Sequence, residues 1–194
     1  AALGLPGLHL KQDIAGAKVR LVGDGILDSD TWWPQVAAGV EFKHVDAGGL
    51  APTLATLGAR LRGTDAYLSA TKLFLAQGVL VDATLRFTKA NQNGLLGFGG
   101  TAHESTSLEP EASIAWLANR MLAFGAEYRA KPDNLNPSAL GAGLKEDDWV
   151  DAFVAWAPCP QFSLTAAWVG LGHIVPAVAT HAQSGAYLSA QFAY

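Results

Sequence analysis

Long hydrophobic runs are missing from this chain, although half of its 194 residues are hydrophobic. No stretch approaches the roughly 18 unbroken apolar residues that a membrane-spanning helix needs, because Gly, Pro or a polar side chain interrupts every run. Charged residues are also scarce, at 15% against about 25% in soluble domains. High but interrupted apolar content favours strands in which apolar and polar residues alternate, as transmembrane strands do.

Cysteine is nearly absent, and so is any surplus of positive charge. The single cysteine, Cys159, lies in a Pro-Cys-Pro turn with no disulfide partner and no second thiol for a metal site. The formal net charge of −4 argues against nucleic acid as a partner, because phosphate binding favours a basic surface. None of the five histidines shows metal-ligand spacing, so no metal or other cofactor is predicted: His9, His44, His103, His173 and His181.

Alternation with period two runs through most of the chain. It predicts about nine strands of roughly ten residues, the length that crosses a bilayer at a tilt. Segment 34–43 is the clearest, with Val36 and Phe42 on one side and Glu41 and Lys43 on the other. Segments with the same pattern are 81–88, 122–129 and 162–169. The predicted fold class is therefore all-β, an antiparallel transmembrane β-barrel.

The last ten residues, GAYLSAQFAY, form another alternating strand that stops on an aromatic residue. Ala186, Leu188, Phe192 and Tyr194 share its apolar face. This strand resembles the closing strand of Gram-negative outer-membrane barrels, whose terminal aromatic is read by the assembly machinery. The resemblance implies an assembly signal at Phe192 and Tyr194, with that machinery and outer-membrane lipid as partners.

The predicted connections alternate in length. Short links are expected at 76–78, 119–120 and 158–161, and long ones at 46–64, 91–107, 131–147 and 172–184. A soluble antiparallel sandwich also has alternating strands, but its loops have no reason to alternate in length so regularly. Short turns on one side and long loops on the other are typical of outer-membrane barrels.

Two of the long loops carry further patterns. Segment 53–62, TLATLGARLR, has helical spacing and predicts a short amphipathic helix that docks on the barrel rim or on a partner. Segment 91–100, NQNGLLGFGG, is expected to fold over or into the barrel mouth, with Leu95, Leu96 and Phe98 as its buried contacts.

The predicted strand number is odd, whereas single-chain bacterial barrels normally have an even number. With the C-terminus in the periplasm, a first strand at about 9–22 would begin outside the cell. The chain also opens without the basic region followed by an apolar core that is typical of a signal peptide, so we expect that such a segment has been removed or that the sequence is a fragment. We expect residues 1–194 to form one barrel domain that lacks N-terminal strands, or one that pairs with another chain, because an open edge in lipid is costly.

Five stretches carry a family resemblance: 10–24, 69–77, 91–100, 127–135 and 146–156. They resemble a family of Gram-negative exported proteins catalogued only as a domain of unknown function, whose members are expected to be porin-like outer-membrane β-barrels. The resemblance runs the length of the chain and implies a barrel in the outer membrane. It implies no activity that can be carried over to particular residues.

If the apolar faces point to lipid, the polar faces line a lumen. Its predicted charged residues are Lys18, Arg20, Lys43, Arg86 and Arg129 against Glu41, Asp82, Glu111, Glu127 and Asp151. Five of each sign indicate pairs that bridge neighbouring strands, either bracing the wall or crossing a water-filled channel. Lys72 shares a face with Leu68 and Phe74, and is expected to snorkel at the periplasmic rim.

Two functions remain open. The first is a porin-like channel or passive transporter for small polar solutes. The second is a plugged structural or scaffold barrel that binds a protein partner, or a second copy, through its external loops or open edge; strand number separates the two. An enzyme is not predicted, because no G-x-S-x-G motif appears and Ser105, Ser107 and Ser138 have no recognisable base nearby.

Overall fold

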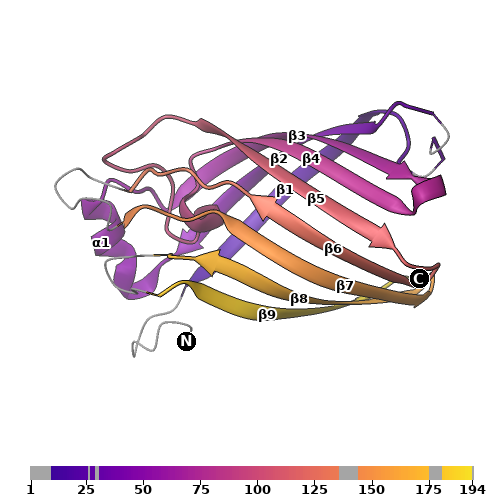
Figure 1. The fold of residues 1–194 in the computed structure, drawn as a ribbon. Helices are drawn as coiled ribbons and strands as arrows, with labels where there is room; N and C mark the ends of the chain where they lie inside the picture. The colour runs from indigo at the N-terminus through magenta and orange to yellow at the C-terminus, as the bar shows by residue number, and fades with distance from the viewer. Residues whose placement is uncertain (1–9, 26, 29–30, 136–143, 175–180, 194) are drawn as a thin grey trace.

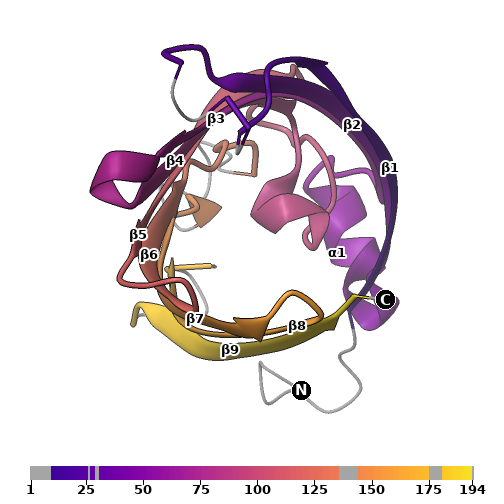
Figure 2. The same ribbon diagram turned by 90° about the vertical axis from the view of Figure 1, so that its right-hand side faces the viewer.

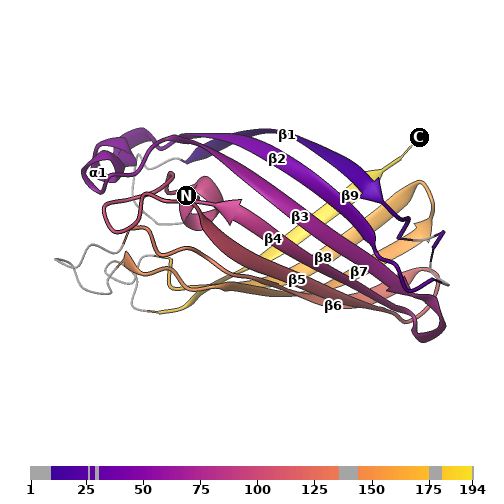
Figure 3. The same ribbon diagram turned by 90° about the horizontal axis from the view of Figure 1, so that it is seen from above.

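The computed structural model describes residues 10–25, 27–28, 31–135, 144–174 and 181–193. Over these residues the chain forms a single antiparallel sheet whose strands follow one another in sequence order (Figure 1). The strands are β1 (Lys11–Val22), β2 (Gln35–Asp46), β3 (Arg62–Phe74), β4 (Val79–Thr88), β5 (Ser107–Leu117), β6 (Leu122–Arg129), β7 (Trp149–Cys159), β8 (Phe162–Gly172) and β9 (Gln183–Phe192). The sheet curls into a ring of oblique strands (Figure 2 and Figure 3). The predicted all-β antiparallel fold of about nine strands is confirmed.

Each strand has an apolar face, and that face points out of the ring. On β4, Leu85 and Phe87 point outward and are 45% and 49% exposed, whereas Thr84 and Thr88 on the other face are buried. Phe192 on β9 is 76% exposed on the same outer surface. A soluble sandwich would bury these faces between two sheets. In the described part of the chain there is one sheet, so the sandwich alternative is wrong.

The first and last strands are the edges of the sheet. Every ladder joins consecutive strands, from β1–β2 to β8–β9, and none of the recorded ladders between described residues joins β1 to β9. The two edge strands come round toward each other in the view along the ring (Figure 2). With nine strands in antiparallel order, β1 and β9 run in the same direction.

The two ends of the ring differ in the length of their connections. Short links at 75–78, 118–121 and 160–161 lie at one end, together with the end of β9 (Figure 1). At the other end lie the long connections, which contain η1 (Gly48–Leu50), α1 (Ala51–Thr56) and η3 (Asn91–Gly94). The predicted alternation in loop length therefore matches the described connections, with one exception.

The exception is the connection 23–34, which lies at the short-link end but is not short. Lys72, at the end of β3, donates hydrogen bonds to the backbone carbonyls of Asp28 and Trp33 at 2.7 and 3.2 Å. The lysine is 8% exposed. It does not snorkel into solvent as expected, because carbonyl oxygens of this connection accept hydrogen bonds from its ammonium.

The predicted helix at 53–62 is shorter than expected and begins earlier. α1 starts with Pro52 in its first turn, where a missing N–H costs nothing, and it ends before Gly58, whose φ is +75°. Beyond Gly58 the chain turns extended, because Arg60 pairs with Phe98. No helix among the described residues is long and apolar enough to cross a membrane.

The buried apolar cluster lies at the long-loop end and not along the strands. It joins the connection between β2 and β3, which contains α1, to the two long connections that follow β4 and β6, through Ala47, Leu54, Ala59, Leu96 and Leu135. Leu96 and Phe98 are buried, as predicted for 91–100, and Phe98 is only 2% exposed. Leu95, which was predicted to be buried as well, is half-buried. The 91–100 loop is therefore anchored by an apolar root.

Candidate functional site

The strand register places all ten predicted lumen residues on the inner face of the ring. Direct pairs such as Glu41 with Asp65, and Glu127 with Asp151, fix this facing from strand to strand. The same register adds two acids that the sequence analysis did not assign to the lumen, Asp65 on β3 and Glu109 on β5. Seven acids therefore face five bases, and the expected balance of five against five is replaced by an acidic excess.

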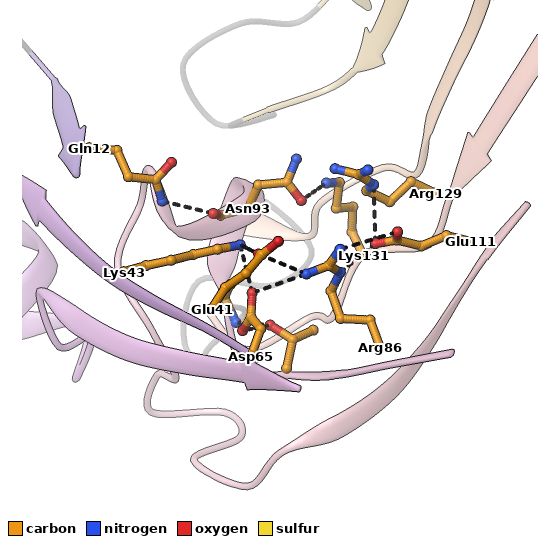
Figure 4. Close-up of polar contacts among 11 residues, drawn as sticks. Gln12, Glu41, Lys43, Asp65, Arg86, Asn93, Glu111, Arg129 and Lys131 are labelled. Carbon is orange, nitrogen blue, oxygen red and sulfur yellow. Dashed lines mark hydrogen bonds and ion pairs between the residues drawn. The ribbon is translucent and has the colours of Figure 1, made fainter. Parts of the chain in front are cut away.

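Asp65 is the centre of the inner charge network, which Figure 4 shows. It is fully buried and accepts hydrogen bonds from Lys43 at 2.7 Å and from Thr88 at 2.6 Å. Glu41 lies directly across from it on β2, a placement that would be repulsive without a cation between them. Lys43 supplies that cation, because its ammonium is also 3.1 Å from Glu41.

Arg86 extends the network across the next strands. Its guanidinium lies 3.0 Å from Glu41 on β2 and 2.6 Å from Glu111 on β5. Because Arg86 belongs to β4, its side chain reaches across β3 to contact β2. Arg129 on β6 adds a second cation to Glu111 at 3.1 Å. These contacts join β2 to β6 (Figure 4). They fit the expectation of paired charges that brace the wall.

The other predicted lumen residues lie outside this network. Arg20 pairs with Asp24 at 2.5 Å near the short-link end, and Lys18 lies 6.0 Å from the ring of Tyr67. Asp82 accepts hydrogen bonds from the hydroxyls of Thr71 and Thr84 at 2.5 and 3.0 Å.

Glu127 on β6 and Asp151 on β7 face each other directly across the ladder. Neither has an ion-pair or hydrogen-bond partner among the residues that the structure describes. Both line a cavity of about 730 Å³ on the inner face of β4 to β9, together with Asp82, Glu111, Arg129 and Tyr187. This half of the inner face bounds an acidic cavity, whereas the half along β2 to β5 carries the paired charges.

A loop enters the ring at the long-loop end. Residues of η3 follow β4 and lie inside the ring of strands (Figure 2). Gln92 and Asn93 have φ of +46° and +58°, a left-handed backbone that is unfavourable for residues with side chains. The surroundings hold this conformation: the backbone N–H of Gln92 donates to Glu146 at 2.8 Å, and Trp149 Nε1 donates to the Gln92 side chain at 3.1 Å.

Glu146 lies beneath the inserted loop and is 4% exposed. Burial raises the pKa of its carboxyl to about 8; the charge of Asp133 adds to the rise, and the Gln92 N–H and the charge of Lys131 oppose it. Its Oε1 atom is buried and has no hydrogen-bond partner in the described structure. The protonated, uncharged form of the Glu146 carboxyl is therefore favoured at neutral pH while the loop is inserted.

Lys131 also lies beneath the inserted loop, where it contacts Asn93. Its ammonium donates to Asn93 Oδ1 at 2.5 Å and stacks over the ring of Trp149, 3.7 Å from its centroid. Burial lowers the pKa of this lysine to about 7, the charges of Arg129 and Lys43 lower it further, and those of Glu146 and Glu111 oppose the shift. Both groups beneath the loop thus change charge near neutral pH.

The pKa shifts of Glu146 and Lys131 together predict that the stability of the inserted loop passes through a minimum as pH changes. With the loop inserted, the Glu146 carboxyl holds a proton that it would release if it were exposed to water. Insertion of the loop therefore becomes less stable as pH rises from 4.5 to about 8. Lys131 acts in the opposite sense, because it loses its proton more readily with the loop inserted than when it is exposed to water. Insertion of the loop therefore becomes more stable as pH rises from about 7 to 10.5. We expect hydrogen-exchange protection of the Gln92 amide, relative to the intrinsic rate, to be lowest between pH 7 and 8.

The matched variant for this pH profile is Glu146→Gln, which keeps an oxygen acceptor for the Gln92 N–H. In this variant the fall in protection on the acid side of the minimum should disappear, and the rise on its alkaline side should remain. Two results would contradict this account. One is protection that rises steadily from pH 5 to 8 in the unaltered protein, and the other is a variant in which protection still falls on the acid side of the minimum.

The predicted assembly signal is described only in part. Phe192 points outward near the end of β9 and packs against the ring of Phe162, with centroids 5.1 Å apart. Tyr194 lies outside the described residues. Within the described ranges there is no group of three His, Cys, Asp or Glu side chains that could hold a metal ion.

Comparison with known proteins gives a family and two distant folds. A family model described as "Protein of unknown function (DUF3034)" matches residues 1–191. No curated protein matches the chain. A crystal structure of the NanC porin is similar at a TM-score of 0.44 and 10% identity, over 97% of this chain and 98% of that one. The outer membrane channel DcaP of Acinetobacter baumannii is similar at 0.38 and 10% identity, over 98% of this chain and 55% of that one.

Proposed function

We propose that this chain, which belongs to the DUF3034 family of proteins of unknown function, forms an outer-membrane channel through which small polar solutes pass passively. The observation that carries the proposal is the pairing of an apolar outer surface with an inner face that bounds an acidic cavity of about 730 Å³. Porin-type barrels have the same distribution, with lipid outside and water inside.

Support for the membrane location comes from the outer surface. Ile114 and Trp116 on β5 and Leu188 on β9 are all more than half exposed, and they belong to an outward apolar set on every strand. An exposed apolar surface of this extent would drive aggregation in water, but lipid tails cover it at no cost.

A charge on this surface should be expensive. Leu68 lies at the middle of β3, points outward and is 44% exposed. Leu68→Arg is expected to lower the free energy of unfolding from lipid vesicles by about 2–4 kcal/mol, because the guanidinium would face the bilayer midplane. Leu68→Met is the matched control and should change little. An arginine tolerated as well as the methionine would contradict the lipid-facing assignment.

Passage itself is tested by liposome swelling. Protein refolded into liposomes should let small sugars enter faster than they enter protein-free liposomes. Amino-acid-sized cations should pass faster than anions of the same size, because unpaired acids line the cavity. Swelling no faster than in protein-free liposomes, with protein shown to be folded by heat-modifiable gel mobility, would contradict the proposal.

The inserted loop favours a second candidate, a plugged scaffold barrel that binds a protein partner. Phe98 and Gln92 are nearly fully buried, and the loop that carries them occupies the mouth of the ring. In this case the strands would support the loops, and no solute would pass. Liposome swelling separates the two candidates.

A further inference from the structure

The inserted loop has an apolar root and a polar tip. At the root, Leu96 packs in the buried cluster with Leu54 and Leu135 at the long-loop end. Asn91 shapes the turn from within, because its amide donates to the carbonyls of Leu96 and Gly99 at 3.3 and 2.8 Å. The loop is thus held firmly on one side, and its tip extends beyond this anchor.

The tip reaches two walls of the ring through one residue. Gln12 on β1 donates its side-chain amide to the backbone carbonyl of Asn93 at 2.9 Å, and Lys131, just after β6, donates to Asn93 Oδ1 at 2.5 Å (Figure 4). In a sheet ordered from β1 to β9, β1 and β6 are far apart around the ring. A residue that contacts both must lie across the opening.

We propose that residues 91–94 form a strap across the lumen, tied by Asn93 to Gln12 and Lys131, and that this strap sets the size limit for solutes. The inference rests on the proposed channel function. Solutes must pass between the strap and the inner face of β4 to β9, through the cavity that Trp149 and Arg129 help to line. The left-handed backbone at Gln92 and Asn93 fits this role, because strained conformations persist where contacts impose them.

The first test asks where the tip lies, without reference to conduction. In a Cys159→Ser background, Ile14→Cys with Asn93→Cys places one thiol on the inner face of β1 and one on the tip, and it keeps the hydrogen bond from Gln12 to the backbone carbonyl of Asn93. A short bifunctional maleimide should join them in folded protein in vesicles, seen as a shift in gel mobility, and each single-cysteine variant should show none. A folded double variant that does not cross-link would overturn the strap.

The second test releases the strap. Gln12→Leu with Lys131→Met removes both ties and leaves the root of the loop unchanged. Lys89→Met is the matched control, because Lys89 lies at the base of the same loop and donates to the carbonyl of Glu104, away from the tip. Release should shift the single-channel conductance to higher values and the swelling cut-off to larger sugars, while the control matches the unaltered protein.

The outcomes separate this inference from the channel function. Conductance and cut-off that stay unchanged on release, in protein that conducts, would overturn the strap and leave the channel standing. Conduction by the released variant alone would overturn the size-limit role and the open channel of the unaltered protein, because the strap would then close the lumen completely. Silence from every folded variant, with the tip cross-linked to β1, would confirm the position of the tip and overturn both its role in solute size and the channel.

Discussion

Replacement of Arg86 by methionine should lower the free energy of unfolding by about 3–5 kcal/mol, because it removes one partner of a buried charge network. The Arg86 side chain is 12% exposed and is the cation shared by Glu41 and Glu111. Without it, Lys43 must serve both Glu41 and the fully buried Asp65, and the inner wall would hold an excess of unpaired carboxylates.

Denaturant unfolding from vesicles, followed by heat-modifiable gel mobility, measures this loss. The matched control is Arg20→Met, which removes an arginine that is 56% exposed and paired with Asp24 near the rim. Exposed pairs contribute no more than about 1 kcal/mol, so the control should unfold nearly like the unaltered protein. Equal losses in the two variants would mean that the network does not brace the wall.

Neutralising Glu127 and Asp151 together should abolish the cation preference of the channel. These two acids face each other on the open side of the lumen and have no ion-pair partner among the described residues. Rings or clusters of one sign at a pore wall select the opposite ion, and neutral amides of the same shape remove that field. Glu127→Gln with Asp151→Asn should therefore shift the reversal potential across a salt gradient toward zero.

The control for this pair changes the net charge equally outside the lumen. Asp13→Asn with Glu104→Gln alters two exposed acids, on the outer face of β1 and in the long connection after β4. The reversal potential of this control should match that of the unaltered protein. A shift of the same size in both double variants would place the selective field outside the cavity.

Strand number and facing could be predicted from the sequence because the period-two pattern is local. On β4, alternation of Leu85 and Phe87 with Arg86 and Thr88 is enough to say which side points out of the ring. The helix bounds at 51–56 needed more than spacing, because Pro52 and Gly58 decided where the helix begins and ends. Additional N-terminal strands or a second chain at the open edge stay predictions.

The site was less accessible to sequence reasoning because its contacts join distant residues. Asp65 is not among the lumen residues predicted from the sequence, because Lys72 shares a face with Leu68 and Phe74 and makes the facing of β3 ambiguous. Its pairing with Glu41 follows once the register is known. Asn93 meets Gln12 across 81 residues of sequence. No local pattern encodes such a contact, although the Gly-rich character of 91–100 did predict a loop in the barrel mouth.

The most direct test of the channel is single-channel conductance of the full-length protein refolded into a planar bilayer, with a salt gradient across it. The account predicts discrete, stable conductance steps and a reversal potential of the sign that indicates cation preference. Silence from protein that heat-modifiable gel mobility shows to be folded would contradict the account and favour a plugged scaffold.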